Sequence, residues 1–406
     1  MNWLLVLIIL IVGCDLFGNF PRMDVLLLPL CVYGYLRYNI KGKPAVFGKR
    51  IMIIMFCVMV STISCNYFRG QSYFDSFMAL RFFWLFMLYY LVFYIQPPAA
   101  NIIKGLKCFY FIYVFLYLLK VLFPNIPIGL SFDSYASITS SDSFTSVFIL
   151  GLYITVFGFS YYLNQFFISG RKHNLLLMSG ALFVWFYSLS RTNLVACIIV
   201  VLYSFCHYTK YKRVKFKTMI GILLAVFLIY NTPIVQQASQ KIITKQTEGS
   251  NLDNDSYIRV IQFDYFVNEH FKSPVEFLLG SGMPHGNSAY GQMMLSHGET
   301  GGIKTGWFDW GMIGLSWVLG ITTVLSLLFL YWKAFRKFVS NQLFFVNLIY
   351  LFFIVSAPFA ILSFDSGGFV MQSFLLYLIS ISTNDFNNNS FVQQRKNNKR
   401  NNSFSM

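Results

Sequence analysis

Two arginines stand out as residues suited to binding an anion. Arg191 lies in the first turn of an apolar helix, after Ser190, where the helix dipole disfavours a cation unless an anion also binds. Free backbone N–H groups and a guanidinium together form a phosphate site. Arg259 lies in a long polar segment further along the chain. The alternatives are an Arg191 side chain that extends to lipid headgroups and an Arg259 on a solvated helix face.

Imidazole and carboxylate groups that are suited to proton transfer lie in the same polar segment as Arg259. His285 belongs to a glycine-rich stretch, residues 279–287, whose backbone can approach a ligand closely. His297 and Glu299 are two positions apart, just before the next apolar stretch. The alternative for each histidine is an ordinary polar loop residue. His285, His297 and Glu299 are therefore candidate site residues.

The composition indicates which elements must position these groups. Of the 406 residues, 56% are hydrophobic and 11% are charged, whereas a soluble domain carries roughly 25% charged residues. Apolar runs recur from end to end, and about 20 such residues cross the hydrocarbon core as a helix. The composition excludes a soluble globular enzyme and predicts an all-α, polytopic membrane protein.

The hydropathy pattern predicts a single membrane domain over residues 1–383, with both termini in the cytoplasm and one large outer loop over about residues 234–304. The Asn- and Lys/Arg-rich residues 384–406 are expected to form a disordered, basic cytoplasmic tail. We expect twelve membrane spans, near residues 2–14, 25–36, 51–67, 82–96, 106–123, 143–163, 174–189, 192–208, 218–233, 307–330, 342–363 and 368–383.

The formal net charge of +16 has a topological explanation. In this arrangement most Lys and Arg residues lie in the inner loops, as the positive-inside rule requires, so no nucleic-acid partner is expected. Arg69, Arg81 and Lys120 are expected to be anchors at the membrane interface. The seven cysteines lie in or beside the predicted spans, which implies neither a disulfide framework nor a metal cluster. We expect no metal and no cofactor.

The outer loop contains a predicted helix that ends before Ser273 and Pro274. Its spacing predicts that four residues share one face. These residues are Arg259, Gln262, Phe266 and His270.

Several short motifs occur in a characteristic order along the chain. They are Ser190–Thr192 at an outer helix start, Arg259 in the long outer loop, Gly280–Gly282 followed by His285, and Phe308–Leu315 at the next span. Together they resemble the O-antigen polymerase and O-antigen ligase superfamily. By position, Arg191 and Arg259 match the family's arginines, and Gly311 and Gly314 match its glycines. The family histidine matches His297 by distance from the glycine pair, or His285 by the glycine-rich stretch.

The resemblance implies glycan transfer from undecaprenyl diphosphate at the periplasmic face of the bacterial inner membrane. Arg191 and Arg259 would stabilise the departing diphosphate. His297, His285 or Glu299 would take the proton from the acceptor hydroxyl as general base. The implied partners are the undecaprenyl-diphosphate-linked glycan as donor and acceptor, membrane lipid, a chain-length regulator and a flippase.

Within this resemblance we expect a polymerase of O-antigen or a related surface polysaccharide. The nearest alternative is the ligase that transfers the glycan to lipid A core. A lipid-linked oligosaccharide flippase is a further alternative, but a transporter is expected to place ionisable residues in the middle of its spans. The centres of the predicted spans are almost free of such residues.

Overall fold

The computed structural model of the chain describes residues 1–14, 23–41, 45–123, 151–188, 191–210, 258–296, 305–337, 339–360 and 364–382. Regular structure in these residues is helical throughout, which confirms the all-α prediction. The predicted span at 218–233, the tail from residue 384, and the candidates His297 and Glu299 lie outside the described residues.

The first half of the chain forms a series of helices separated by short connections. In order, they are α1 (Trp3–Cys14), η1 (Met23–Leu27), α2 (Leu28–Lys41), α3 (Gly48–Arg69), α4 (Tyr73–Ala79), α5 (Arg81–Trp84), η2 (Leu85–Met87), α6 (Leu88–Ile95) and α7 (Ala99–Leu122).

The second half continues with α9 (Tyr153–Ser169), α10 (His173–Tyr187), α11 (Arg191–Lys210), α14 (Ile258–Asp264), the π-helical turn η3 (Tyr265–Glu269), α15 (Pro274–Leu279), α16 (Ala289–Ser296), η5 (Trp307–Trp310), α17 (Gly311–Leu319), α18 (Ile321–Arg336), α19 (Phe344–Ser356) and a last helix, Ser366–Ser382.

Three described helices are long and apolar enough to cross a membrane: α3, α7 and the Thr192–Thr209 part of α11. The pair Tyr73–Ala79 and Arg81–Ile95 adds a fourth if it counts as one span, although it is bent by 65°. Four shorter helices are also apolar, namely α1, α10, α19 and Ser366–Ser382. These helices fit a membrane protein, and the count of twelve spans stays a prediction.

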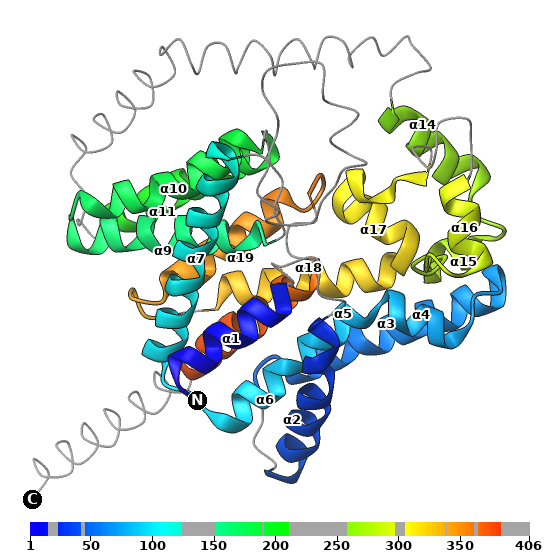
Figure 1. The fold of residues 1–406 in the computed structure, drawn as a ribbon, viewed down its shortest axis with the longest axis horizontal. Coiled ribbons are helices and arrows are strands. Elements are labelled where there is room, and N and C mark those ends of the chain that lie inside the picture. The colour runs from blue at the N-terminus through cyan, green and yellow to red at the C-terminus, as the bar shows by residue number, and fades with distance from the viewer. Residues whose placement is uncertain are drawn as a thin grey trace, which may run out of the picture.

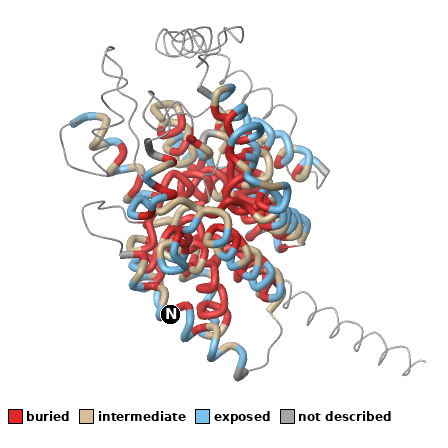
Figure 2. The backbone as a smooth tube through the Cα atoms, turned by 90° about the vertical axis from the view of Figure 1, so that its right-hand side faces the viewer, coloured by how far each residue is buried: buried red, intermediate tan, exposed pale blue. Residues whose placement is uncertain are grey.

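Helix α18 crosses the middle of the molecule and packs on both α3 and α19 (Figure 1). Helix α9 packs against α7, α10 and α19, whereas α3 packs against α4, α15, α17 and α18. Buried residues concentrate in the middle of the molecule and exposed residues at its periphery (Figure 2). The large core includes the buried rings of Tyr113, Trp185, Tyr331 and Tyr350.

The segment expected to form one span at 307–330 is interrupted. It forms η5, α17 and α18, with a break at Gly320. Gly320 has a φ of 82°, and a Cβ there would lie 2.4 Å from the carbonyl carbon of Leu279. The break therefore occurs where the end of α15 packs on the α17–α18 junction, an approach that only glycine permits. This contact also brings part of the long loop against the helices.

Candidate functional site

A buried ion pair fastens the end of α3 to residues far along the chain. Arg69 Nε lies 2.5 Å from Glu276 Oε1, and the two side chains are 6% and 0% exposed. A second guanidinium nitrogen, Nη2, donates to the carbonyl of His270, and the guanidinium lies 5.4 Å from the ring centroid of Tyr290. The prediction that Arg69 is an interface anchor is therefore wrong, because its charge is neutralised inside the protein.

Arg81, also predicted to be an anchor, pairs with a carboxylate as well. Its Nε lies 3.1 Å from Asp24 Oδ2, and Asp24 also accepts a hydrogen bond of 2.8 Å from the Ser366 hydroxyl. Both arginines thus join elements that are distant in sequence. A sequence alone does not distinguish an arginine that extends to lipid headgroups from one that pairs with a carboxylate, because the carboxylate is distant along the chain.

The first turn of α15 holds Glu276 in place. Ser273 caps this helix and accepts a hydrogen bond of 3.2 Å from the Glu276 backbone N–H. Glu276 Oε2 in turn accepts a hydrogen bond of 2.7 Å from the backbone N–H of Lys272. A carboxylate at this position is stabilised by the helix dipole. The end of α3 therefore docks on a capped helix start that carries a carboxylate.

The glycine-rich stretch packs on protein backbone. The N–H groups of Ser281 and Gly282 donate to the carbonyls of Trp317 and Val318, at 3.1 and 2.8 Å. Burial raises the pKa of Tyr290, whose hydroxyl stays protonated and donates to Ser281 Oγ at 3.0 Å. Gly280, with a φ of 90°, would place a Cβ 2.3 Å from Gly320 N. The sequence predicts that this glycine-rich backbone approaches a ligand closely. At Gly280–Gly282 it instead approaches the backbone of α17 and joins the loop to that helix.

Gln71 fixes the next part of the loop. Its side chain is almost completely buried, and Oε1 accepts hydrogen bonds from the His285 N–H at 2.9 Å and the Ser288 hydroxyl at 2.7 Å. Nε2 donates to the Met283 carbonyl at 2.9 Å and to Ser76 Oγ at 3.0 Å. A single amide therefore sets the position of residues 283–288 relative to the start of α4.

His285 lies beside a carboxylate of α4. Its Nδ1 is 3.3 Å from Asp75 Oδ1, and the two side chains are 11% and 27% exposed. The Ser72 hydroxyl, which caps α4, donates to Asp75 Oδ2 at 2.7 Å and accepts from the Asp75 N–H at 3.0 Å. Ser72 thus holds Asp75, and Gln71 holds the main chain of His285, while both side chains stay partly exposed to solvent.

Two nearby glycines show how tightly the main chain of His285 is packed on one side. A Cβ at Gly291 would lie 1.9 Å from the His285 carbonyl oxygen, whereas a Cβ at Gly286 would meet nothing within 4 Å. The chain beside Gly286 is open, and Gly286 and Asn287 are exposed. The histidine is thus supported on the α16 side and accessible beside residues 286 and 287.

The pair can perform acid–base chemistry. A carboxylate beside Nδ1 favours the tautomer that carries its proton there, which leaves Nε2 to accept a proton. The same carboxylate stabilises the imidazolium that forms. The separation of 3.3 Å is longer than a well-aligned hydrogen bond, as is common in catalytic pairs before substrate binds.

The predicted shared face of the loop helix is only partly correct. Gln262, Phe266 and His270 are buried, but Arg259 is exposed. The π-helical turn over Tyr265–Glu269 is wider than an α-helical turn and rotates His270 back toward the side of Gln262. Arg259 therefore falls at the edge of the buried face and points its charge outward.

The structure places the other predicted site residues as follows. Arg191 is the first residue of α11, as the sequence predicts, and nothing is described of its side chain. Gly311 packs on the end of α19, where a Cβ would lie 2.6 Å from the Ala357 carbonyl oxygen. At Gly314 a Cβ would lie 1.7 Å from the Trp307 carbonyl oxygen. The two glycines therefore serve close packing.

Sequence reasoning missed Gln71, Asp75 and Glu276. A signal for the two carboxylates exists, because Ser72–Asp75 and Ser273–Glu276 both have the capping-box pattern of a serine followed three positions later by an acid. Gln71 has no comparable local signal.

No protein-family model matches this chain, and no curated protein matches it either.

Proposed function

We propose that this chain is a membrane glycosyltransferase that joins undecaprenyl-diphosphate-linked repeat units into a surface polysaccharide at the outer leaflet of the bacterial inner membrane. The observation that carries the proposal is the His285–Asp75 pair, which stands partly exposed at the end of the long apolar helix α3. The order of motifs that resembles the O-antigen polymerase superfamily supports the same activity.

In the proposed reaction His285 acts as the general base. Nε2 takes the proton of an acceptor hydroxyl as its oxygen attacks the anomeric carbon of the donor sugar. The new glycosidic bond forms while the bond between that carbon and the diphosphate oxygen breaks, and the electron pair leaves with the diphosphate. Asp75 stabilises the imidazolium that results. Such proton transfer contributes about 10²–10⁴-fold to a rate.

Arginines are proposed to stabilise the negative charge of the departing diphosphate. Arg259 is suited to this role, because it is exposed and takes part in none of the three ion pairs between described residues. Arg191 at the first residue of α11 is the second candidate, since the helix start adds its own backbone N–H groups. Arg69 is unsuited, because it is 6% exposed and paired with Glu276.

The charge distribution along α3 supports the proposed orientation. Lys49 and Arg50 lie at its N-terminal end, whereas Asp75 and His285 lie beyond its C-terminal end. The positive-inside rule assigns the basic end to the cytoplasm. The His285–Asp75 pair then faces the periplasm, where a lipid diphosphate is an activated donor that needs no nucleotide.

The test is the lipopolysaccharide or capsule gel profile of a strain that lacks the gene. We expect lipid A core with a single repeat unit in the deletion strain, and a restored ladder with the wild-type gene. His285→Ala is expected to leave single units at normal protein abundance. His173→Ala, which changes an exposed histidine at the start of α10, is the matched control and should restore the ladder.

Bare core in the deletion strain would contradict a polymerase. Long polymer retained on undecaprenyl diphosphate would then indicate the ligase, and single lipid-linked units at the cytoplasmic face would indicate the flippase. A full ladder with His285→Ala would contradict the assigned base.

A further inference from the structure

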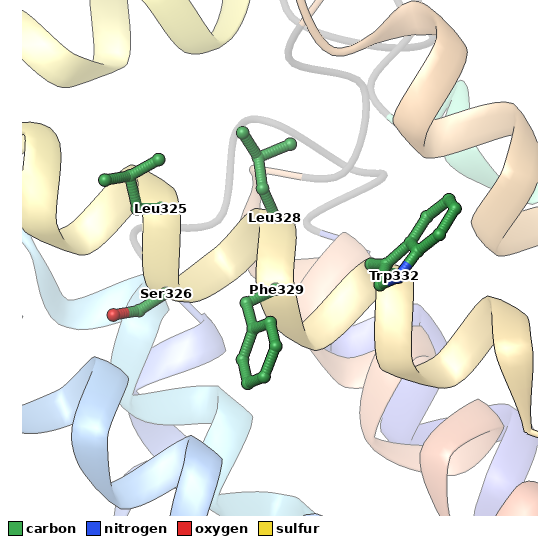
Figure 3. A pocket seen from close by; sticks show the side chains of 5 residues that line it. All are labelled: Leu325, Ser326, Leu328, Phe329 and Trp332. Atoms are coloured by element: carbon green, nitrogen blue, oxygen red, sulfur yellow. The ribbon is translucent and has the colours of Figure 1, made fainter.

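An apolar groove runs along an exposed face of α18, outside the His285–Asp75 site. It has a volume of about 580 Å³ and is lined by Leu325, Ser326, Leu328, Phe329 and Trp332. Figure 3 shows these side chains along consecutive turns of the helix. Leu325, Phe329 and Trp332 are 58%, 56% and 47% exposed. The groove is shallow and open, so it can hold an extended chain along the helix but does not enclose a compact ligand.

Cations cover the aromatic walls of this groove. The Arg50 guanidinium lies 4.2 Å from the ring centroid of Phe329, and that of Arg336 lies 5.6 Å from the ring centroid of Trp332. Burial lowers the pKa of Lys333, and the positive charges of Arg50 and Lys337 lower it further. The four cations do not take part in the ion pairs between described residues. They are Arg50, Lys333, Arg336 and Lys337.

Such a cluster of like charges is unfavourable unless an anion lies among them. The groove itself, beside these cations, is lined only by apolar side chains and the Ser326 hydroxyl. That hydroxyl already donates to the Thr322 carbonyl at 2.8 Å. The ligand that fits both features has a negatively charged head and an alkyl chain.

We propose that this groove is a binding site for an anionic phospholipid of the cytoplasmic leaflet. An acyl chain lies along Leu325, Phe329 and Trp332, and the phosphate lies among Arg50, Lys333 and Arg336. Basic sites at the cytoplasmic ends of membrane helices bind anionic lipid headgroups in this way. The basic residues are those that the positive-inside rule assigns to the cytoplasm. The proposal is independent of the polysaccharide activity.

Native mass spectrometry of the purified full chain tests the proposal. The protein in neutral detergent is titrated with phosphatidylglycerol or with phosphatidylcholine of the same acyl chains. The wild type should retain phosphatidylglycerol about 100-fold more tightly, since each of the three nearby cations contributes roughly a fivefold gain for an anionic lipid. The double variant Arg50→Gln, Arg336→Gln should reduce this preference to about fivefold, because only Lys333 remains. Phe329→Ala should weaken retention of both lipids.

Arg37→Gln is the matched control. Arg37 lies 5.4 Å from the exposed ring of Tyr33 on α2, in the same arginine–aromatic arrangement, and its loss should leave retention unchanged. Equal retention of the two lipids by the wild type would overturn the proposal, even if the variants fail to fold. An effect of Arg37→Gln equal to that of the double variant would also overturn it. So would displacement of phosphatidylglycerol by inorganic phosphate alone, or tighter retention of undecaprenyl phosphate than of phosphatidylglycerol.

Discussion

Two regions of the molecule are held together by different forces. The core around α9, α10 and α19 is built from large buried rings, such as those of Trp185 and Tyr350, and neutral hydrogen bonds such as Trp185 Nε1 to Thr155 Oγ1, at 2.6 Å, join its helices. The contact between the end of α3 and residues 270–291 depends instead on a buried ion pair and the Gln71 amide.

The difference shows how a long loop segment is positioned on a helical bundle. The second region has a small apolar cluster of its own, which consists of Cys65, Tyr265, Phe266, Tyr290, Met294 and Trp317. Apolar packing is not directional, whereas an ion pair and an amide fix both distance and orientation. We therefore expect substitutions in the core to change stability, and substitutions in the second region to change stability and transfer activity together.

The largest effect is expected from Arg69→Ala. It leaves Glu276 buried without its counter-charge, which costs about 3–5 kcal/mol for a buried pair. Thermal unfolding in detergent should show the loss, and limited proteolysis should cut near residues 270–291. The double variant Arg69→Met, Glu276→Leu should recover most of the stability, because it buries no charge. An unchanged melting temperature for Arg69→Ala would contradict the buried pair.

Gly291→Ala should have the next largest effect. The new methyl group collides with the carbonyl oxygen of His285, and overpacking of this kind costs about 1–3 kcal/mol. Because His285 must shift, we expect polymer formation to fall more than protein abundance does. Gly286→Ala is the control, since its methyl group enters open space. Equal activities of these two variants would show that the backbone position of His285 is unimportant.

Thr155→Val tests the other region. It leaves the buried Trp185 indole N–H without its acceptor and should cost about 1–2 kcal/mol. Transfer activity per folded molecule should stay at the wild-type value, because the change lies in the core. A large loss of specific activity with intact folding would mean that the two regions are coupled.

Arg259→Ala should have the smallest effect on stability, since the side chain is exposed. We nevertheless expect fewer repeat units per chain, because the charge proposed to stabilise the departing diphosphate is lost. Arg171→Ala, an exposed arginine before α10, is the matched control. Identical polymer profiles for both variants would remove Arg259 from the proposed site.

The sequence predicts the apolar helices well but not how the long loop packs. The expected spans at 51–67 and 106–123 correspond to α3 and α7, because hydrophobic runs report helices directly. The partner of Arg69 is 207 positions away, and no local pattern reveals it. The break at Gly320 likewise depends on a contact with α15. For His285 the residue type indicates possible chemistry, whereas its neighbour Asp75 emerges only from the fold.

The most direct test is the initial rate of polymer formation from lipid-linked repeat units in membranes that contain equal amounts of each variant. His285→Ala should lower this rate by about 10²–10⁴-fold, as expected for loss of a general base. Asp75→Asn should also lower it, because the imidazolium loses its counter-charge and the imidazole loses its preferred tautomer. A wild-type rate for His285→Ala would contradict the assignment of this pair as the catalytic site.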